Sequence, residues 1–104
     1  MRIVYVTAPP DKAPELARAL VGEQLAACVN LVPAVRSIYR WQGKVEDDAE
    51  TLMIIKTTAE AMPALTARVK ELHPYSVPEV LVVPASDNEG NMDYITWVRE
   101  SVKR

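Results

Sequence analysis

The fold of this chain is decided by VNLVPAVRSIYRW at residues 29–41 and VEDDAETLMIIKT at residues 45–57. Gly43 marks a turn between the two runs, and the second is apolar on both faces through Leu52–Ile55. Apolar residues alternate along most of the first run, which predicts a strand. The alternation assigns one set of side chains to one face: Val29, Leu31, Val35, Tyr39 and Trp41. Two strands joined by one tight turn form a β-hairpin.

A helix is expected on each side of this hairpin. Asp11 is a candidate cap for the first helix, and Pro14 falls in its first turn, where a missing N–H costs little. Thr58 is a candidate cap for the second helix, which ends at His73-Pro74 because a residue before proline avoids the α region. Each helix then carries one apolar face: Leu16, Leu20 and Val21 in the first, and Met62, Leu65, Val69 and Leu72 in the second.

Two short strands and a last helix complete the pattern. Ile3–Thr7 and Val80–Val83 are apolar runs, each followed by proline. The order βαββαβ is the ferredoxin-like arrangement, an α+β fold with both helices on one side of a four-stranded antiparallel sheet. The sequence therefore predicts a single domain over residues 1–104, closed by a short C-terminal helix. Asn91 is the expected cap of that helix, and its expected inner side is Tyr94, Ile95, Trp97, Val98 and Val102.

The hairpin is too long for its own domain. Its first strand, residues 29–41, spans about 43 Å at ~3.3 Å per residue, whereas a compact domain of 104 residues has a diameter of about 33 Å. The protruding part would expose strand edges and large apolar side chains, which soluble proteins avoid, and pairing with neighbouring subunits would cover them. A monomer whose hairpin bends back, with Pro33 as the kink, is the alternative. The apolar residues concerned are Ile38, Tyr39, Trp41 and Val45.

Composition narrows the class of protein. The chain is 49% hydrophobic and 25% charged, as in globular proteins, and its net charge of −2 provides no basic surface for nucleic acid. Cys28 is the only cysteine, so a disulfide framework is excluded and a cytoplasmic location is expected. The apolar run at the start is too short for a signal peptide or a membrane span. Eight prolines favour high thermal stability, because most restrict the unfolded chain at element ends.

Four strings point to a known family: LAACVN at residues 25–30, SIYRWQGK at 37–44, the segment 50–57, and LHPYSVPE at 72–79. In this order they resemble the CutA family of divalent-cation tolerance proteins, and the resemblance covers nearly the whole chain. The resemblance implies a ferredoxin-like subunit, a tight PII-like homotrimer, and an association with tolerance to copper and other divalent cations. It implies no catalytic reaction and no required cofactor.

Cys28 and His73 are the candidate metal ligands. A thiolate suits a soft ion such as Cu(I), and a neutral imidazole suits copper or zinc. Each residue also has a structural interpretation, Cys28 as a small buried apolar residue and His73 as a helix cap or the partner of a loop carbonyl. Family members proposed to bind copper carry a Cys before Thr-Ala-Pro and a His pair before Pro-Tyr. Val6 and Leu72 occupy two of those positions here, so that ligand set is incomplete.

A second candidate site consists of polar residues on or beside strands: Tyr39, Glu50, Lys56 and Glu79. If these four converge on a cleft between subunits, they would hold an anionic or amphiphilic small ligand, with Lys56 supplying the charge. The alternative is a network of salt bridges between subunits. The neighbouring acidic run Glu46–Glu50 is expected to be solvated charge at the hairpin tip, where it guards the strand edge.

No catalytic site is expected. A single histidine would have to serve every role, and the three glycines are not grouped into a phosphate-binding loop. Trp41 and Trp97 are expected to fill an interface and the core rather than to form a ligand platform. Three hypotheses remain: a trimeric metal-binding or metal-homeostasis protein, a PII-like sensor with a small ligand in its intersubunit clefts, and a structural trimeric scaffold.

Overall fold

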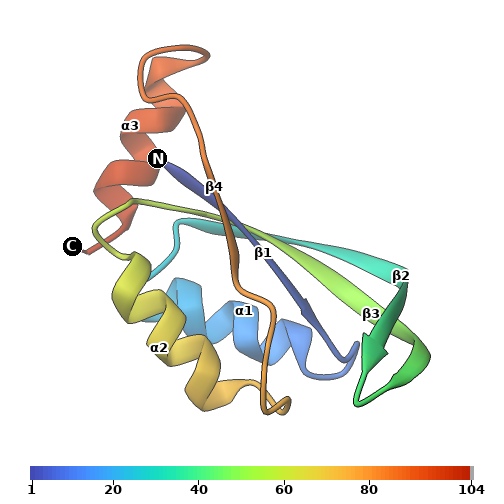
Figure 1. Cartoon of the computed structure of the whole chain (residues 1–104). Helices are drawn as coiled ribbons and strands as arrows, with labels where there is room; N and C mark the ends of the chain where they lie inside the picture. The colour runs from blue at the N-terminus through green and yellow to red at the C-terminus, as the bar shows by residue number, and fades with distance from the viewer. Residues whose placement is uncertain (104) are drawn as a thin grey trace.

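The computed structural model describes residues 1–103 and contains a four-stranded sheet with three helices (Figure 1). The strands lie in the order β2-β3-β1-β4, and every neighbouring pair is antiparallel. This arrangement confirms the predicted α+β ferredoxin-like fold with a long hairpin and a short last helix. The elements in chain order are β1 (Arg2–Ala8), α1 (Ala13–Gly22), β2 (Cys28–Trp41), β3 (Lys44–Thr57), α2 (Met62–Leu72), β4 (Leu81–Pro84) and α3 (Met92–Ser101).

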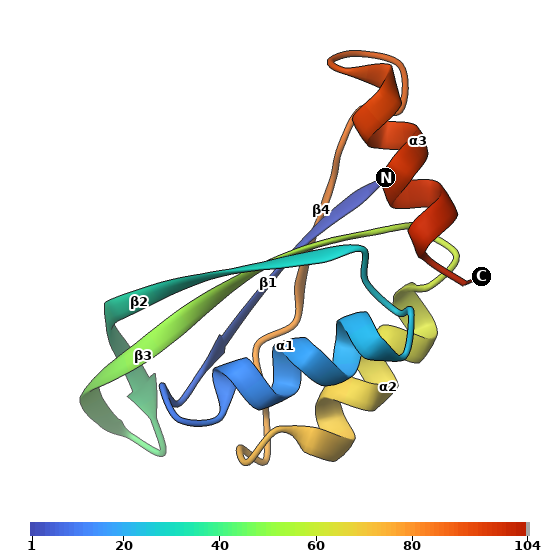
Figure 2. The same cartoon turned by 180° about the vertical axis from the view of Figure 1, so that it is seen from behind.

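Helices α1 and α2 lie on the same side of the sheet, and α3 packs at the end of the sheet beside the N-terminus (Figures 1 and 2). Val4 and Val6 of β1 and Met53 and Ile55 of β3 are fully buried beneath α1 and α2. The residues that alternate with them on both strands point to the opposite face and are only half-buried: Ile3, Tyr5, Leu52 and Ile54. The sheet therefore presents an apolar face that α1 and α2 leave open.

The hairpin contains an irregularity near its middle. The register of β2 against β3 shifts by one residue between Val32 and Val35. Val32 pairs with Leu52 and Val35 with Glu50, so β2 advances by three residues while β3 advances by two. Ala34 has a φ of 62°, a conformation that an L-residue rarely adopts, and it follows Pro33 directly. This β-bulge confirms the irregularity predicted at Pro33.

The bulge also corrects the predicted face of β2. Val29 and Leu31 pair with odd-numbered residues of β3 and face the helices with them. Beyond the bulge, Val35, Tyr39 and Trp41 pair with even-numbered residues of β3 and lie on the opposite face. The sequence alternation placed all five on one face because one inserted residue inverts the side-chain pattern of a strand.

Beyond the bulge, β2 and β3 form a two-stranded arm, residues 35–50, that extends past β1 and α1 (Figure 1). The longest dimension of the molecule is 44 Å, against 25 and 21 Å for the other two. Gln42 and Gly43 close the arm with φ values of 49° and 78°, as a tight hairpin turn requires. Ile38 and Val45 are 65% and 66% exposed. Apolar strand surface is thus exposed on the arm, as predicted, but the outer part of the arm turns sharply instead of continuing straight (Figures 1 and 2).

Several details of the helices differ from the prediction. α2 is preceded by Ala61 without a side-chain cap, so Thr58 is not its cap, and Val21 and Leu72, expected on the apolar helix faces, are 42% and 40% exposed. The first helix is preceded by Lys12 without a side-chain cap, so Asp11 does not cap it. Asn91 does cap α3, because its Oδ1 accepts a hydrogen bond of 3.1 Å from the Asp93 amide. On α3, Tyr94 and Trp97 are 40% and 46% exposed rather than on the inner side. Only the remaining predicted positions of its inner side are buried: Ile95, Val98 and Val102.

Candidate functional site

A groove of about 560 Å³ lies where the arm meets the segment between α2 and β4. β1 and β3 each contribute one residue, the arm contributes a row from β2, and the segment after α2 forms the far wall. Three aromatic rings and two carboxylates stand among small polar and apolar side chains. The lining residues are Thr7, Ser37, Ile38, Tyr39, Trp41, Glu50, Tyr75, Ser76, Val77 and Glu79.

Glu50 lies at the base of the groove and is 4% exposed. Its Oε2 accepts a hydrogen bond of 2.8 Å from the Tyr75 hydroxyl. His73 positions Tyr75 in turn, since its Nδ1 accepts from the Tyr75 amide at 3.1 Å and the two rings lie 4.6 Å apart. The His73 Nε2 lies 2.8 Å from the carbonyl oxygen of Thr7. Because Nδ1 accepts, Nε2 carries the proton and donates, so the ring is the neutral tautomer.

Tyr39 and Asp48 form a second pair on the groove side of the arm. The Tyr39 hydroxyl donates to Oδ2 of Asp48 at 2.5 Å. This hydrogen bond, with smaller contributions from burial and nearby acids, raises the pKa of Tyr39 to about 12. Glu46, Asp48 and Glu50 alternate along β3, so all three side chains lie on one face of the arm. The acidic run is therefore a ladder beside the groove and not only solvated charge at the tip.

Glu79 brings a further carboxylate to the same groove from the segment before β4. Partial burial, and secondarily the charge of Glu50, raises the pKa of Glu79 above its ordinary value. Burial and the hydrogen bond to Glu50 likewise raise the pKa of the Tyr75 hydroxyl. The groove thus holds carboxylates that repel each other and tyrosines that stay protonated.

Within one chain, Tyr39, Glu50 and Glu79 line the same groove, and Lys56 does not; the predicted meeting of all four in a cleft between subunits stays a prediction. Lys56 lies six residues from Glu50 on β3, or about 20 Å along the strand. Its ammonium group donates to Asn30 and lies 4.0 Å from the Cys28 thiol. The groove therefore lacks the positive charge that the sequence analysis assigned to it, since no lining residue is basic.

The two candidate metal ligands lie apart. Cys28 pairs with Lys56, and Lys56 lies opposite Ile3 of β1. His73 is instead hydrogen-bonded to Thr7 of β1. Ile3 and Thr7 are four residues apart, or about 13 Å along the strand. Both ring nitrogens of His73 are already hydrogen-bonded. Within residues 1–103, no three His, Cys, Asp or Glu side chains are grouped as a metal site. These positions do not fit a copper site within one chain.

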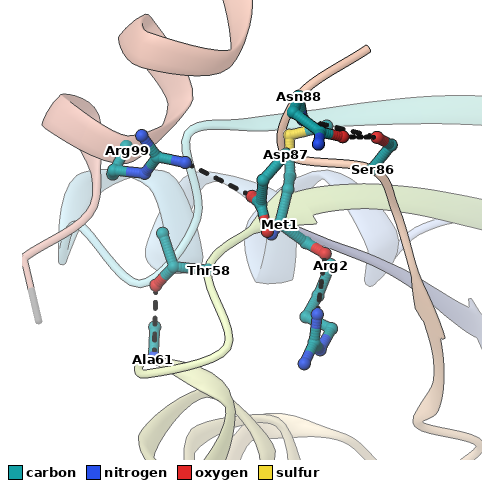
Figure 3. Close-up of polar contacts among 8 residues, drawn as sticks. All are labelled: Met1, Arg2, Thr58, Ala61, Ser86, Asp87, Asn88 and Arg99. Atoms are coloured by element: carbon teal, nitrogen blue, oxygen red, sulfur yellow. Dashed lines mark hydrogen bonds and ion pairs between the residues drawn. The ribbon is translucent and has the colours of Figure 1, made fainter.

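A smaller cavity of about 160 Å³ lies at the other end of the sheet, between α3 and the start of β1. Figure 3 shows its polar contacts: Asp87 accepts from the amino group of Met1 at 2.5 Å and from Arg99 at 3.3 Å. The nearby amino group, with Arg99, lowers the pKa of Asp87. Thr58 accepts a hydrogen bond of 3.3 Å from the Ala61 amide just before α2. This cluster joins the loop after β4 to β1 and α3 through the ion pairs of Asp87 with the Met1 amino group and Arg99.

Sequence reasoning missed Tyr75 and the position of Trp41 in the groove. Tyr75 comes from a loop, where no periodic pattern reveals a side chain's direction, although it sits within the LHPYSVPE string. Trp41 is 42% exposed and lies on the groove face, because the bulge directs it there.

Among residues 1–103, no helix is both long and apolar enough to cross a membrane.

Nearly the whole chain is similar to known proteins. A family model described as CutA1 divalent ion tolerance protein matches residues 2–101. The divalent-cation tolerance protein CutA of Thermus thermophilus is 52% identical over 100 residues, which cover 95% of each chain. Protein CutA of Homo sapiens is 52% identical over 97 residues, which cover 92% of this chain and 53% of that protein, so the chain spans about half of it.

A solved structure agrees with these matches. The PII-like protein CutA from Nostoc sp. PCC 7120, in apo form, superposes with a TM-score of 0.94 at 38% identity, over 99% of this chain and 98% of that chain. The family description and the name of the Thermus thermophilus protein describe tolerance to divalent ions, and the name of the Nostoc structure describes likeness to PII. None of the names describes an enzyme.

Proposed function

The chain belongs to the CutA1 family of divalent ion tolerance proteins, and we propose that it functions as a homotrimer that contributes to divalent-cation tolerance by binding a ligand, not by catalysis. The observation that carries the proposal is the apolar arm of residues 35–50, which projects from the subunit with its large side chains exposed. A two-stranded projection is marginally stable by itself in water. Contact with other copies of the chain would stabilise it.

The surfaces that such contact requires are continuous on the subunit. β2 and β4 are the two edges of the sheet, so both have a row of backbone groups free to pair with another strand. Leu81 and Val83 of β4 are 59% and 39% exposed and continue the apolar face that α1 and α2 leave open. An arm laid against the open face of a neighbour would bury both apolar surfaces, and three copies related by a threefold axis would close the ring.

The test is the mass of the protein in solution. Light scattering coupled to size exclusion, at micromolar concentration, is expected to give three times the 11.6 kDa mass of one chain. The double variant Ile38→Glu/Val45→Glu places charge on the most exposed apolar positions of the arm and should give a single-chain mass. Val21→Glu, on the outer side of α1 and 42% exposed, is the matched control and should stay trimeric. A well-folded wild-type protein of single-chain mass would overturn the proposal.

Copper is the ion that the family resemblance implies, and the residues here do not fit a site for it within one subunit. Cys28 and His73 lie near opposite ends of β1, and the ring nitrogens of His73 are hydrogen-bonded to Thr7 and Tyr75. We therefore assign the contribution to divalent-cation tolerance to ligand binding by the assembled protein and not to copper held within one subunit. A cytoplasmic location belongs to the same proposal, because a thiol at Cys28 and no disulfide suit a reducing compartment; cell fractionation tests it.

A second candidate function is that of a PII-like sensor with a small ligand in a cleft, and the groove beside the arm favours it. The groove is within the size range of small-molecule sites and combines apolar and aromatic walls with a few convergent polar groups. A thermal-shift screen with nucleotides, carboxylates and amines tests this function. A rise in melting temperature with one class, lost when the groove is altered, would support a sensor, and no response from any class would leave the trimer without this role.

A further inference from the structure

The groove has an unusual charge, because it contains a buried carboxylate and no basic residue. Its ten lining residues include two carboxylates and no lysine, arginine or histidine. Glu50 is more than nine-tenths buried and forms no salt bridge within residues 1–103. Its one hydrogen bond, from the Tyr75 hydroxyl, supplies no positive charge. Buried carboxylates in proteins are ordinarily paired with a cation, because removing an unpaired charge from water is costly.

We propose that the groove binds an organic ammonium ion, a primary amine or a quaternary ammonium group, with Glu50 and Glu79 as its counter-charges and the rings of Tyr39 and Trp41 against its alkyl or methyl groups. This inference rests on the proposed sensor function, since it names the class of ligand for that groove. It differs from the anionic ligand expected from the sequence, because no basic residue of the same chain lines the groove.

The hydrogen-bond donors of the groove support a cation over an anion. The hydroxyls of Tyr39 and Tyr75 already donate to Asp48 and Glu50. An incoming anion would meet carboxylate oxygens and tyrosine donors that are already engaged. An ammonium group has donors of its own and would satisfy those oxygens, so the bound state would pair charges that now repel. The raised pKa of Glu79, caused partly by Glu50, agrees with this repulsion.

The walls favour an organic ion over a bare metal. Tyr39, Trp41 and Tyr75 line the groove, and aromatic faces attract alkylammonium ions through their ring quadrupoles. The two tyrosine rings are held by their hydroxyl bonds and are therefore pre-organised. Within residues 1–103, no trio of His, Cys, Asp and Glu is placed to replace the water shell of a metal ion. A volume of about 560 Å³ also admits a ligand of several heavy atoms.

Trp41 supplies the readout. The chain has two tryptophans, so Trp97→Phe leaves Trp41 as the only one and makes its fluorescence a local signal from the groove. The trimer form of this variant is titrated with 1,4-diaminobutane, tetramethylammonium, butanoate and Mg²⁺ at constant ionic strength. The amines should change the emission with saturation, and butanoate and Mg²⁺ should not. Glu50→Gln and Glu79→Gln should each weaken amine binding by about tenfold or more.

Glu89→Gln removes a carboxylate that is exposed and outside the groove, so it is the matched control and should bind as the parent does. If Glu50→Gln does not fold, Glu79→Gln carries the test, because Glu79 is largely exposed. Saturable binding of butanoate alone would overturn this inference and keep the sensor function. A response to Mg²⁺ alone would overturn it in favour of a hydrated metal. A trimer that responds to no probe would overturn both the inference and the sensor function, whereas the trimer itself is tested separately by mass.

Discussion

The two halves of the hairpin are parts of the same pair of strands, yet they are built for different surroundings. The half before the bulge lies in the sheet, where Met53 and Ile55 are fully buried beneath α1 and α2. The half beyond it, the arm, exposes Ile38 and Val45 and has no third strand beside it within residues 1–103. The first half is completed by its own subunit. The second exposes large apolar side chains among its charged residues and has no partner for them in the chain, which indicates that its partner is another molecule.

The bulge at Pro33 and Ala34 separates these halves. Removing it is the change from which we expect the largest effect on assembly and ligand binding. Deletion of Ala34 would make the pairing of β2 with β3 continuous and return Tyr39 and Trp41 to the other face of the arm. We expect loss of the trimer and of any ligand response at Trp41, measured by light scattering and fluorescence. Ala34→Gly is the control, because glycine accepts a φ of 62° and keeps the residue count. A trimer with an intact groove after the deletion would show that the bulge does not set the faces.

A matched pair of isoleucines sharpens the comparison. Ile55→Ala removes a fully buried side chain and should lower the free energy of unfolding by about 2–5 kcal/mol. Ile38→Ala removes the same atoms from a side chain that is 65% exposed in the subunit. Its effect should appear in the subunit dissociation constant and not in the unfolding of the isolated subunit. Urea unfolding at several protein concentrations separates the two effects. Equal, concentration-independent losses for both variants would remove the distinction.

His73 links the buried half to the groove and should behave as a structural residue. His73→Ala removes hydrogen bonds to the Thr7 carbonyl and the Tyr75 amide and leaves both groups without their partner. We expect a loss of about 1–3 kcal/mol in unfolding free energy, with the copper stoichiometry unchanged. Cys28→Ser should change neither quantity substantially. A copper titration in which His73→Ala alone loses one equivalent per chain would assign this residue to a metal site.

The smallest expected effect is on the pKa of the Tyr39 hydroxyl in the arm. The Asp48 hydrogen bond raises the pKa of Tyr39 from about 10 to about 12. A raised pKa means that the folded protein favours the protonated hydroxyl, so this contribution to stability is complete below pH ~10 and is lost as the pH rises through about 12. Asp48→Asn should return the Tyr39 transition toward its ordinary value in a tyrosinate absorbance titration. Glu89→Gln should leave it in place. Equal titration curves for the wild type and Asp48→Asn would contradict the pairing.

The fold and the arm could be predicted from the sequence because they rest on long-range patterns. Alternation over residues 29–41, the turn at Gly43 and the helical stripes each extend over several residues, so one wrong assignment does not change the topology. The protrusion followed from the length of the strands alone. The face of the arm could not be predicted, since Pro33 indicates an irregularity but does not say how many residues it inserts.

The candidate site was predictable in part. Tyr39, Glu50 and Glu79 line one groove of the subunit, whereas Lys56 of the same chain does not. Within one chain the spacing already separates the two residues, because six residues of extended strand place Lys56 about 20 Å from Glu50; the predicted cleft between subunits would need Lys56 of a neighbouring chain. Tyr75 was not foreseen, because it reaches the groove from a loop whose path depends on the bonds of His73 to Thr7 and to Tyr75 itself.

Amide hydrogen exchange tests the central claim most directly, because it compares the two halves within one sample. At micromolar concentration, we predict that the amides of the arm, residues 35–50, exchange nearly as slowly as those of residues 52–57, and that they become fast in Ile38→Glu/Val45→Glu. Protection of this kind requires a partner surface over the arm. Fast exchange throughout the arm of the wild-type protein, beside slow exchange in residues 52–57, would show that the arm stands free in solution and would contradict the account.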